Sequence, residues 1–147
     1  MTLAIRPVES EEAWNEARMI RTRVFIDEQA CPPELEWDAY EATSRHLVGY
    51  VDGEPVAASR WRATTYDEAV ASKLERFAVL PEHRGRGYGR EMVRLTMEDA
   101  RRAGFSTFVL HAQAHLEAFY RSFGFETTGE PFEEAGIRHI KMARRET

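Results

Sequence analysis

Residues 84–89 read Arg-Gly-Arg-Gly-Tyr-Gly, between the apolar, strand-like run LERFAVL (74–80) and the helical pattern REMVRLTMEDARRAG (90–104). A strand that turns through glycines into a helix builds an anion site, because glycine lets several backbone N–H groups point the same way. The helix N-terminus adds roughly half a unit of positive charge. Arg86, Arg90 and Arg94 are spaced four apart and predict a basic stripe. In a chain of net charge −5, this local excess predicts that a polyanion docks here.

Three other interpretations of the glycine-rich stretch compete. A flexible loop beside a solvated arginine face stays open, because glycine loops and charged helices are common. A Rossmann dinucleotide site needs G-x-G-x-x-G, and Arg90 stands where the last glycine would be. A Walker A loop needs G-K-[ST] after its spaced glycine, which this sequence lacks.

Length and composition indicate one ordinary globular unit. The chain has 147 residues, 43% of them hydrophobic, which fits a single domain over residues 1–147. The net charge argues against a nucleic-acid surface. No apolar run approaches the about 20 residues of a membrane span, and the N-terminus lacks a secretory pattern. Cys31 is the only cysteine, so we expect no intrachain disulfide, no metal and a reducing, cytoplasmic setting.

Hydrophobic periodicity predicts a mixed α/β fold in the order β-α-β-β-β-α-β-α-β-β, with helices on both faces of a mixed sheet. Ser10 is the expected N-cap of the first helix. The long segment 31–44 is expected to be a loop. The elements expected are strands in 2–8, 45–51, 55–64, 71–80, 106–112, 125–132 and 137–143, and helices in 10–29, 87–103 and 115–123.

The segment FAVLPEHRGRGYGREMV (77–93) resembles the acetyl-CoA-binding segment of the GNAT superfamily of N-acetyltransferases, whose pattern is [QR]-x-x-G-x-[GA]. Arg84, Gly87 and Gly89 match this pattern in register. The resemblance implies that the backbone amides of the turn hold the diphosphate of acetyl-CoA, and that the preceding strand pairs with the pantetheine arm. The cofactor-binding residues implied are Phe77, Ala78, Val79, Arg84, Gly85, Arg86, Gly87, Tyr88, Gly89 and Arg90.

The segment LHAQAHLEAFYRSFGF (110–125) resembles the second GNAT signature. Tyr120 falls where the family keeps a tyrosine beside the CoA sulfur, and a phenol there can protonate the thiolate leaving group. The alternative is a core aromatic beside Phe119 and Phe123. Gln113 takes the position of an asparagine that binds the cofactor. His111 and His115 flank it, and two histidines without a third ligand make a poor metal site.

Acetylation of an amine requires a neutral nitrogen, so a base is useful. Lys73, Glu75 and Phe77 alternate along one strand and are expected on one face. Glu75 is therefore the candidate general base, either directly or through water. The alternative is that Glu75 pairs with a neighbouring arginine.

The ends of the chain resemble the ElaA/YjcF-like branch of small acetyltransferases, through RTRVFIDEQ (21–29), His46 and GIRHIKM (136–142). Acidic residues crowd the segment 27–41, which corresponds to the usual acceptor wall in the fold that the resemblance implies: Asp27, Glu28, Glu34, Glu36, Asp38 and Glu41. This predicts a small cationic amine, an amino sugar or a polyamine-like acceptor; the alternative is a solvated acidic loop. Candidate acceptor residues are Glu28, His46, His111 and His139.

These features together predict an N-acetyltransferase that transfers the acetyl group of acetyl-CoA to a primary amine of a small molecule, by direct attack in a ternary complex. No cysteine or serine is set up to form a covalent intermediate. The alternatives are a non-catalytic acyl-CoA sensor and a nucleotide-dependent enzyme. Homodimers are common for the fold that the resemblance implies, although the sequence locates no interface.

Overall fold

The computed structural model describes residues 2–146, and its strands form a seven-stranded mixed sheet in the order β1-β2-β3-β4-β5-β7-β6. Neighbouring strands are antiparallel except β4 and β5, which are parallel. The strands are β1 (Ala4–Pro7), β2 (Arg45–Val51), β3 (Glu54–Tyr66), β4 (Ala69–Val79), β5 (Thr107–Gln113), β6 (Glu126–Glu134) and β7 (Ile137–Arg145).

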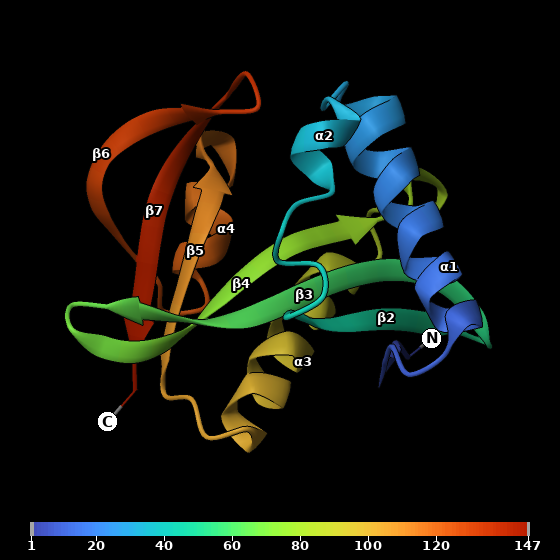
Figure 1. Ribbon diagram of the computed structural model, residues 1–147, viewed down its shortest axis with the longest axis horizontal. Helices are drawn as coiled ribbons and strands as arrows, with labels where there is room; N and C mark the ends of the chain where they lie inside the picture. Colours follow the sequence, from blue (N-terminus) through green and yellow to red (C-terminus); the bar gives the residue numbers. More distant parts are fainter. Residues whose placement is uncertain (1, 147) are drawn as a thin grey trace.

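Helices cover both faces of the sheet (Figure 1). On one side, called the α1 face, α1 (Glu11–Arg21) runs into the π-helical η1 (Thr22–Glu28), which is followed by the short α2 (Pro33–Glu36). On the other side, called the α3 face, lie α3 (Tyr88–Arg102) and α4 (Glu117–Arg121). Two 3-10 turns, η2 (Pro81–His83) and η3 (Ala114–Leu116), connect strands to these helices.

The predicted fold class and order of elements are confirmed, and two local features were missed. Ser10 caps α1 as expected, because its hydroxyl accepts a hydrogen bond from the Ala13 amide at 3.1 Å. The first helix changes to π-helical geometry after Arg21, and the expected loop contains α2. Within residues 2–146, no helix is long and apolar enough to cross a bilayer.

The two halves of the sheet meet along a very short parallel contact. Only Ser72 with Phe108 and Lys73 with Val109 are paired between β4 and β5. Beyond these pairs the two strands diverge, as Figure 1 shows. The edge of β4 that faces β5 therefore has no strand partner from Glu75 to Val79, within the described chain.

A bulge in β4 corrects one prediction. Arg76 has a φ of 60°, and the pairing with β3 shifts by one residue between Ala58 and Arg60. A one-residue shift moves the side chains that follow to the other face. Phe77 consequently packs against the core of the α3 face, whereas Glu75 contacts residues on the α1 face. The expectation that Lys73, Glu75 and Phe77 share one face was wrong for Phe77.

The close approach of β2 to α3 allows a test of this packing. A Cβ atom on Gly49 would lie 2.8 Å from Met92 Sδ and 3.0 Å from Leu3 Cδ1, both buried. Gly49→Ala should therefore lower the free energy of unfolding by about 1–3 kcal/mol, measured by urea denaturation. Met92→Ala lowers stability by itself, but in that background Gly49→Ala should cost less, and a double-mutant cycle measures the difference. A fully stable Gly49→Ala variant would contradict the packing described.

Candidate active site

The glycine-rich turn presents a row of free backbone amides at the start of α3. Gly85 and Gly87 have φ values of 78° and 83°, in the left-handed region that favours glycine. Gly87 precedes the first turn of α3 and provides no side-chain cap. The amides of residues 85–90 donate to no acceptor within residues 2–146, and the first bond into the helix is from the Glu91 amide to the Gly87 carbonyl. Such a turn can bind an anion.

The arginines around the turn differ in the partners that they bind. The Arg84 guanidinium donates two hydrogen bonds of 2.7 Å to the Glu28 carboxylate and one of 2.9 Å from Nε to the Val79 carbonyl. Arg90 donates to Ser122 Oγ at 2.8 Å and lies over the Phe123 ring. Arg86 precedes α3 instead of lying on it, so the predicted helical stripe begins at Arg90.

Arg94 and Arg86 differ in how far other charges neutralise them. Arg94 pairs with Glu91 and Glu98 on its own helix. Arg86 has no ion-pair partner in the described part of the chain, and its side chain is exposed. An anion at this turn would therefore meet free amides and Arg86 first, while Arg84 already holds a carboxylate.

Tyr120 lies on α4, on the α3 face beside the opening between β4 and β5. Its side chain is 7% exposed, and its ring centroid lies 6.4 Å from that of Phe77 and 5.1 Å from that of Phe119. Its hydroxyl has no hydrogen-bond partner among residues 2–146. Burial raises the pKa of the phenol well above its ordinary value, so the group stays protonated at neutral pH. The ring is part of the core, and the hydroxyl remains available as a donor.

Glu75 lies on the α1 face among three cations. Its Oε1 accepts hydrogen bonds from Arg60 Nε at 3.2 Å and from Arg62 Nε at 2.9 Å, and its Oε2 lies 3.5 Å from Lys73 Nζ. Burial opposes ionisation, but the charges of Arg60, Lys73 and Arg62 hold the pKa of the carboxyl below its ordinary value. The arginine pairing, one of the two interpretations from the sequence, is what the structure contains.

The acidic segment does not present an open wall of free carboxylates between residues 36 and 41. Glu36, Asp38 and Glu41 are each bound by two arginines that reach across from α1, β3 and β4. The ion pairs are Arg21 with Glu36 (2.7 Å) and Glu41 (2.8 Å), Arg60 with Asp38 (2.8 Å) and Glu41 (2.8 Å), and Arg76 with Glu36 (3.2 Å) and Asp38 (3.1 Å). Both Arg21 and Arg60 are fully buried. Residues 36–41 are thereby fixed to the sheet, and the charges of these three carboxylates are neutralised.

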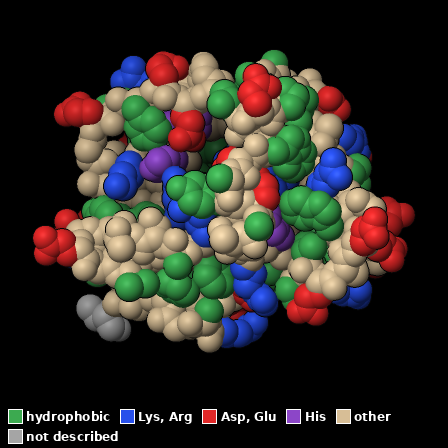
Figure 2. All heavy atoms as spheres, in the orientation of Figure 1, with side chains coloured by type: hydrophobic (Ala, Val, Ile, Leu, Met, Phe, Trp, Pro, Cys, Tyr) green, Lys and Arg blue, Asp and Glu red, His purple; other side chains and the backbone are tan. Residues whose placement is uncertain are grey.

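Gln113 and two of the candidate histidines lie on the α1 face, on the half of the sheet formed by β5, β7 and β6. Gln113 Nε2 donates to Gln29 Oε1 at 3.0 Å, which joins the end of β5 to the residue after η1. His111 Nδ1 lies 3.3 Å from Glu134 Oε1, and His139 Nε2 lies 3.7 Å from Glu134 Oε2. Figure 2 shows histidine, acidic and basic side chains gathered on this part of the surface.

Two of the proposed acceptor residues lie away from this group. His46 Nε2 donates a hydrogen bond to the Glu41 carbonyl at 2.7 Å, and its ring packs edge-on against Trp14; burial lowers the pKa of His46. Glu28 is the partner of Arg84 at the glycine-rich turn. The sequence reasoning missed Glu134, because only the pairing of β6 with β7 brings it beside the histidines.

Comparison with known proteins identifies the family. The family model described as "Acetyltransferase (GNAT) domain" matches residues 6–146. The chain is similar to the uncharacterised N-acetyltransferase YjcF of Bacillus subtilis, with 37% identity over 92% of this chain and 94% of that protein. It is also similar to protein ElaA of Escherichia coli, with 36% identity over 85% of this chain and 82% of that protein.

Solved structures agree with these relatives. The crystal structure of Escherichia coli ElaA matches with a TM-score of 0.83 and 30% identity, over 98% of this chain and 100% of that one. An acyl-CoA N-acyltransferase from Pseudomonas aeruginosa matches with a TM-score of 0.85 and 28% identity, over 97% and 98% of the two chains. The fold and the family model together define an acetyltransferase. The chain belongs to the GNAT family, in its ElaA/YjcF-like branch, and the prediction of a GNAT-type N-acetyltransferase is confirmed.

Proposed function

We propose that this protein transfers the acetyl group of acetyl-CoA to a primary amine of a small molecule, by direct attack in a ternary complex. The observation that carries the proposal is the row of free amides at residues 85–90, next to the unpaired edge of β4 that leads toward Tyr120. The Pseudomonas aeruginosa neighbour, described as an acyl-CoA N-acyltransferase, supports an acyl-CoA as the donor.

The residues present fit coenzyme A. The free amides and Arg86 suit a diphosphate, which needs several N–H donors and positive charge in one place. The edge of β4 at Phe77, Ala78 and Val79, where the Val79 carbonyl already accepts from Arg84 Nε, offers its remaining backbone groups to the amides of pantetheine. Gln113 supplies a side-chain amide at the end of β5, on the other side of the opening between the strands.

The proposed reaction uses three groups: the acceptor amine, the Tyr120 phenol and the Glu75 carboxylate. The amine nitrogen attacks the thioester carbonyl carbon, so that a C–N bond forms and the C–S bond breaks. Tyr120 donates its phenolic proton to the departing thiolate. As the C–N bond forms, the attacking nitrogen becomes far more acidic than an ordinary ammonium group. Its proton passes to Glu75 through water and then to solvent.

Replacing Glu75 with Gln tests its role as the proton acceptor. We expect Glu75→Gln to lower kcat by roughly 10- to 100-fold, because the relay loses its acceptor. The wild-type rate should rise with pH as the free amine becomes available, and this rise should continue to higher pH in the variant. Glu82→Gln, which changes an exposed carboxylate that pairs with Arg23, is the matched control and should keep the wild-type profile.

Release of free thiol from acetyl-CoA with a panel of primary amines tests the proposed function. Turnover of at least one amine, with the acetylated product found by mass spectrometry, is the expected result. The second candidate is an acyl-CoA sensor, and it predicts that CoA raises the melting temperature while no amine is turned over. A nucleotide-dependent enzyme predicts instead that ATP or NAD raises the melting temperature more than CoA does.

A further inference from the structure

We propose that the acceptor amine also carries a carboxylate, and that the Arg62 guanidinium and the Lys73 ammonium bind it on the α1 face. The proposal rests on the proposed acetyl transfer and names the class of its acceptor: an amino carboxylate. It differs from the cationic acceptor that the acidic segment predicted from sequence.

Within the described chain, the ion pairs near the opening between β4 and β5 leave two cationic side chains, Arg62 and Lys73, with unused donors. Three carboxylates of the acidic segment (Glu36, Asp38 and Glu41) are matched by three arginines (Arg21, Arg60 and Arg76). What remains on β3 and β4 is Arg62 and Lys73 beside Glu75, a carboxylate that Arg60 also contacts. From β6, the Glu134 carboxylate acts on Lys73 electrostatically but forms no ion pair with it. Arg62 and Lys73 therefore keep donors that an anionic group on the acceptor would use.

Arg62 and Lys73 have hydrogen-bond donors that no carboxylate in the described part of the chain uses, and these donors could bind a ligand. Arg62 uses only its Nε, in the bond to Glu75, so the two terminal nitrogens of the guanidinium have no hydrogen-bond partner within residues 2–146. Among residues 2–146, the ion pair of Lys73 Nζ is the 3.5 Å approach to Glu75. The Arg62 and Lys73 side chains are 13% and 17% exposed. Their terminal nitrogens nevertheless remain accessible to solvent, because they are not among the fully buried atoms without a partner. Donors that are partly desolvated and still reachable hold a carboxylate more strongly than fully exposed ones.

The geometry of Arg62 is fixed before any ligand arrives. Its guanidinium carbon lies 3.7 Å from the ring centroid of Tyr40, so the planar group is stacked on the acidic segment. Its Nε donates to Glu75, and this bond sets the direction in which the two terminal nitrogens of the guanidinium point. A planar guanidinium held in this way can accept a carboxylate through two parallel hydrogen bonds, and less ordering entropy is lost on binding.

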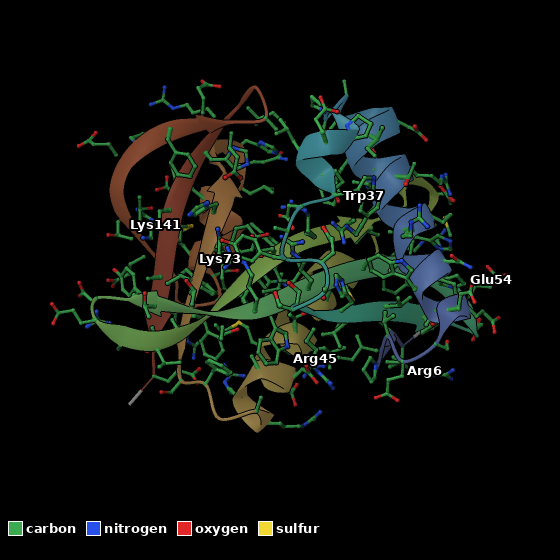
Figure 3. The ribbon with its side chains drawn as sticks, in the orientation of Figure 1. Arg6, Trp37, Arg45, Glu54, Lys73 and Lys141 are labelled. Atoms are coloured by element: carbon green, nitrogen blue, oxygen red, sulfur yellow. The ribbon has the colours of Figure 1, made fainter. Side chains whose placement is uncertain are left out.

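The site is also in the right place for the reaction. Arg62 and Lys73 face each other across β3 and β4, and Lys73 is the last residue of β4 paired with β5 before the strands diverge. Figure 3 labels Lys73 at this point of the sheet. Glu75 lies two residues further along β4, about 6–7 Å toward the opening. A carboxylate held by Arg62 and Lys73 therefore leaves the amine of the same molecule beside Glu75 and the opening.

Matched pairs of acceptors test the proposal. The probes are 4-aminobutanoate, 6-aminohexanoate and several L-amino acids, each compared with its neutral carboxamide. We expect kcat/KM for the best carboxylate to exceed that of its carboxamide by roughly 10- to 100-fold, the range of a charge-assisted hydrogen bond. Arg62→Gln should reduce this ratio to about one, and Arg62→Lys should restore part of it. Arg102→Gln removes an exposed guanidinium at the end of α3 and should leave the ratio unchanged.

A measurement of equilibrium binding tests the acceptor class independently of the proposed acetyl transfer. Calorimetric titration of each probe into the CoA complex requires no turnover, and the wild-type chain should bind the carboxylates more tightly than the carboxamides. If carboxylates bind by this measure but no probe is acetylated, the acetyl transfer fails and the binding site stands. If carboxamides or simple amines bind and react as well as the carboxylates, or if Arg62→Gln leaves the preference intact, the amino-carboxylate assignment is overturned. A chain that binds none of the probes also overturns it.

Discussion

Replacing Tyr120 with Phe should lower kcat for acetyl transfer by about 100- to 10,000-fold, while the affinity for acetyl-CoA stays within a few-fold of wild type. The size of the loss is that of a positioned general acid, which is the role assigned to the phenol. The affinity should persist because the ring, which packs against Phe77 and Phe119, is retained and only the hydroxyl is removed. The measurement is thiol release under saturating acetyl-CoA, with binding followed by calorimetry.

The pH dependence of the same rate gives a second readout. Because burial raises the pKa of Tyr120, the phenol should remain protonated throughout the neutral and mildly alkaline range. The wild-type kcat should therefore show no falling limb up to at least about pH 10, the ordinary pKa of tyrosine. Tyr50→Phe is the matched control, since it removes the hydroxyl of another largely buried tyrosine, one that donates to Glu16 on the α1 face at 2.5 Å. A Tyr120→Phe variant with most of the wild-type kcat would rule out the acid role.

Replacing Gly89 with Asp should weaken CoA binding by roughly 100-fold or more. A carboxylate in the first turn of α3 would stand among the amides that are proposed to hold the diphosphate and would repel it. The fold should tolerate the change, because Gly89 has no left-handed φ and a Cβ atom there would lie 3.9 Å from Val79, an ordinary contact. An acidic residue in the first turn of a helix is itself slightly stabilising.

The melting temperature without CoA separates a lost site from a lost fold. Gly89→Asp should melt at or above the wild-type temperature in the absence of CoA, yet lose the increase that CoA produces. Gly89→Ala is the control: it adds the same Cβ without the charge, and alanine is allowed at this position of the GNAT pattern. We expect its affinity for CoA to remain within about tenfold of wild type. Equal affinity for CoA in Gly89→Asp and Gly89→Ala would contradict a diphosphate at this turn.

Local sequence signals predicted the elements and the glycine-rich turn well. The turn is a contiguous stretch in which glycine permits the left-handed backbone at Gly85 and Gly87, so its shape depends on few distant contacts. The same holds for the Ser10 cap, which needs only the amide three residues later. The order of strands and helices followed from periodicity because each element has one buried stripe or face.

The surroundings of the proposed acceptor could not be predicted in the same way. The bulge at Arg76 places a residue without glycine's freedom at a positive φ, and no local pattern marks it, so the face of Phe77 was assigned wrongly. The acidic segment looked free because its partners, Arg21, Arg60 and Arg76, lie up to 40 residues away in sequence. The pairing that brings Glu134 to His111 and His139 likewise depends on how β6, β7 and β5 assemble.

A crystal structure of the protein with coenzyme A tests the central claim most directly. We predict that the diphosphate oxygens lie within about 2.7–3.2 Å of backbone nitrogens between Gly85 and Arg90. The pantetheine arm should run along the free edge of β4 toward Tyr120. A structure in which the diphosphate binds elsewhere, with these amides directed to solvent, would contradict the proposed site and the transfer mechanism that depends on it.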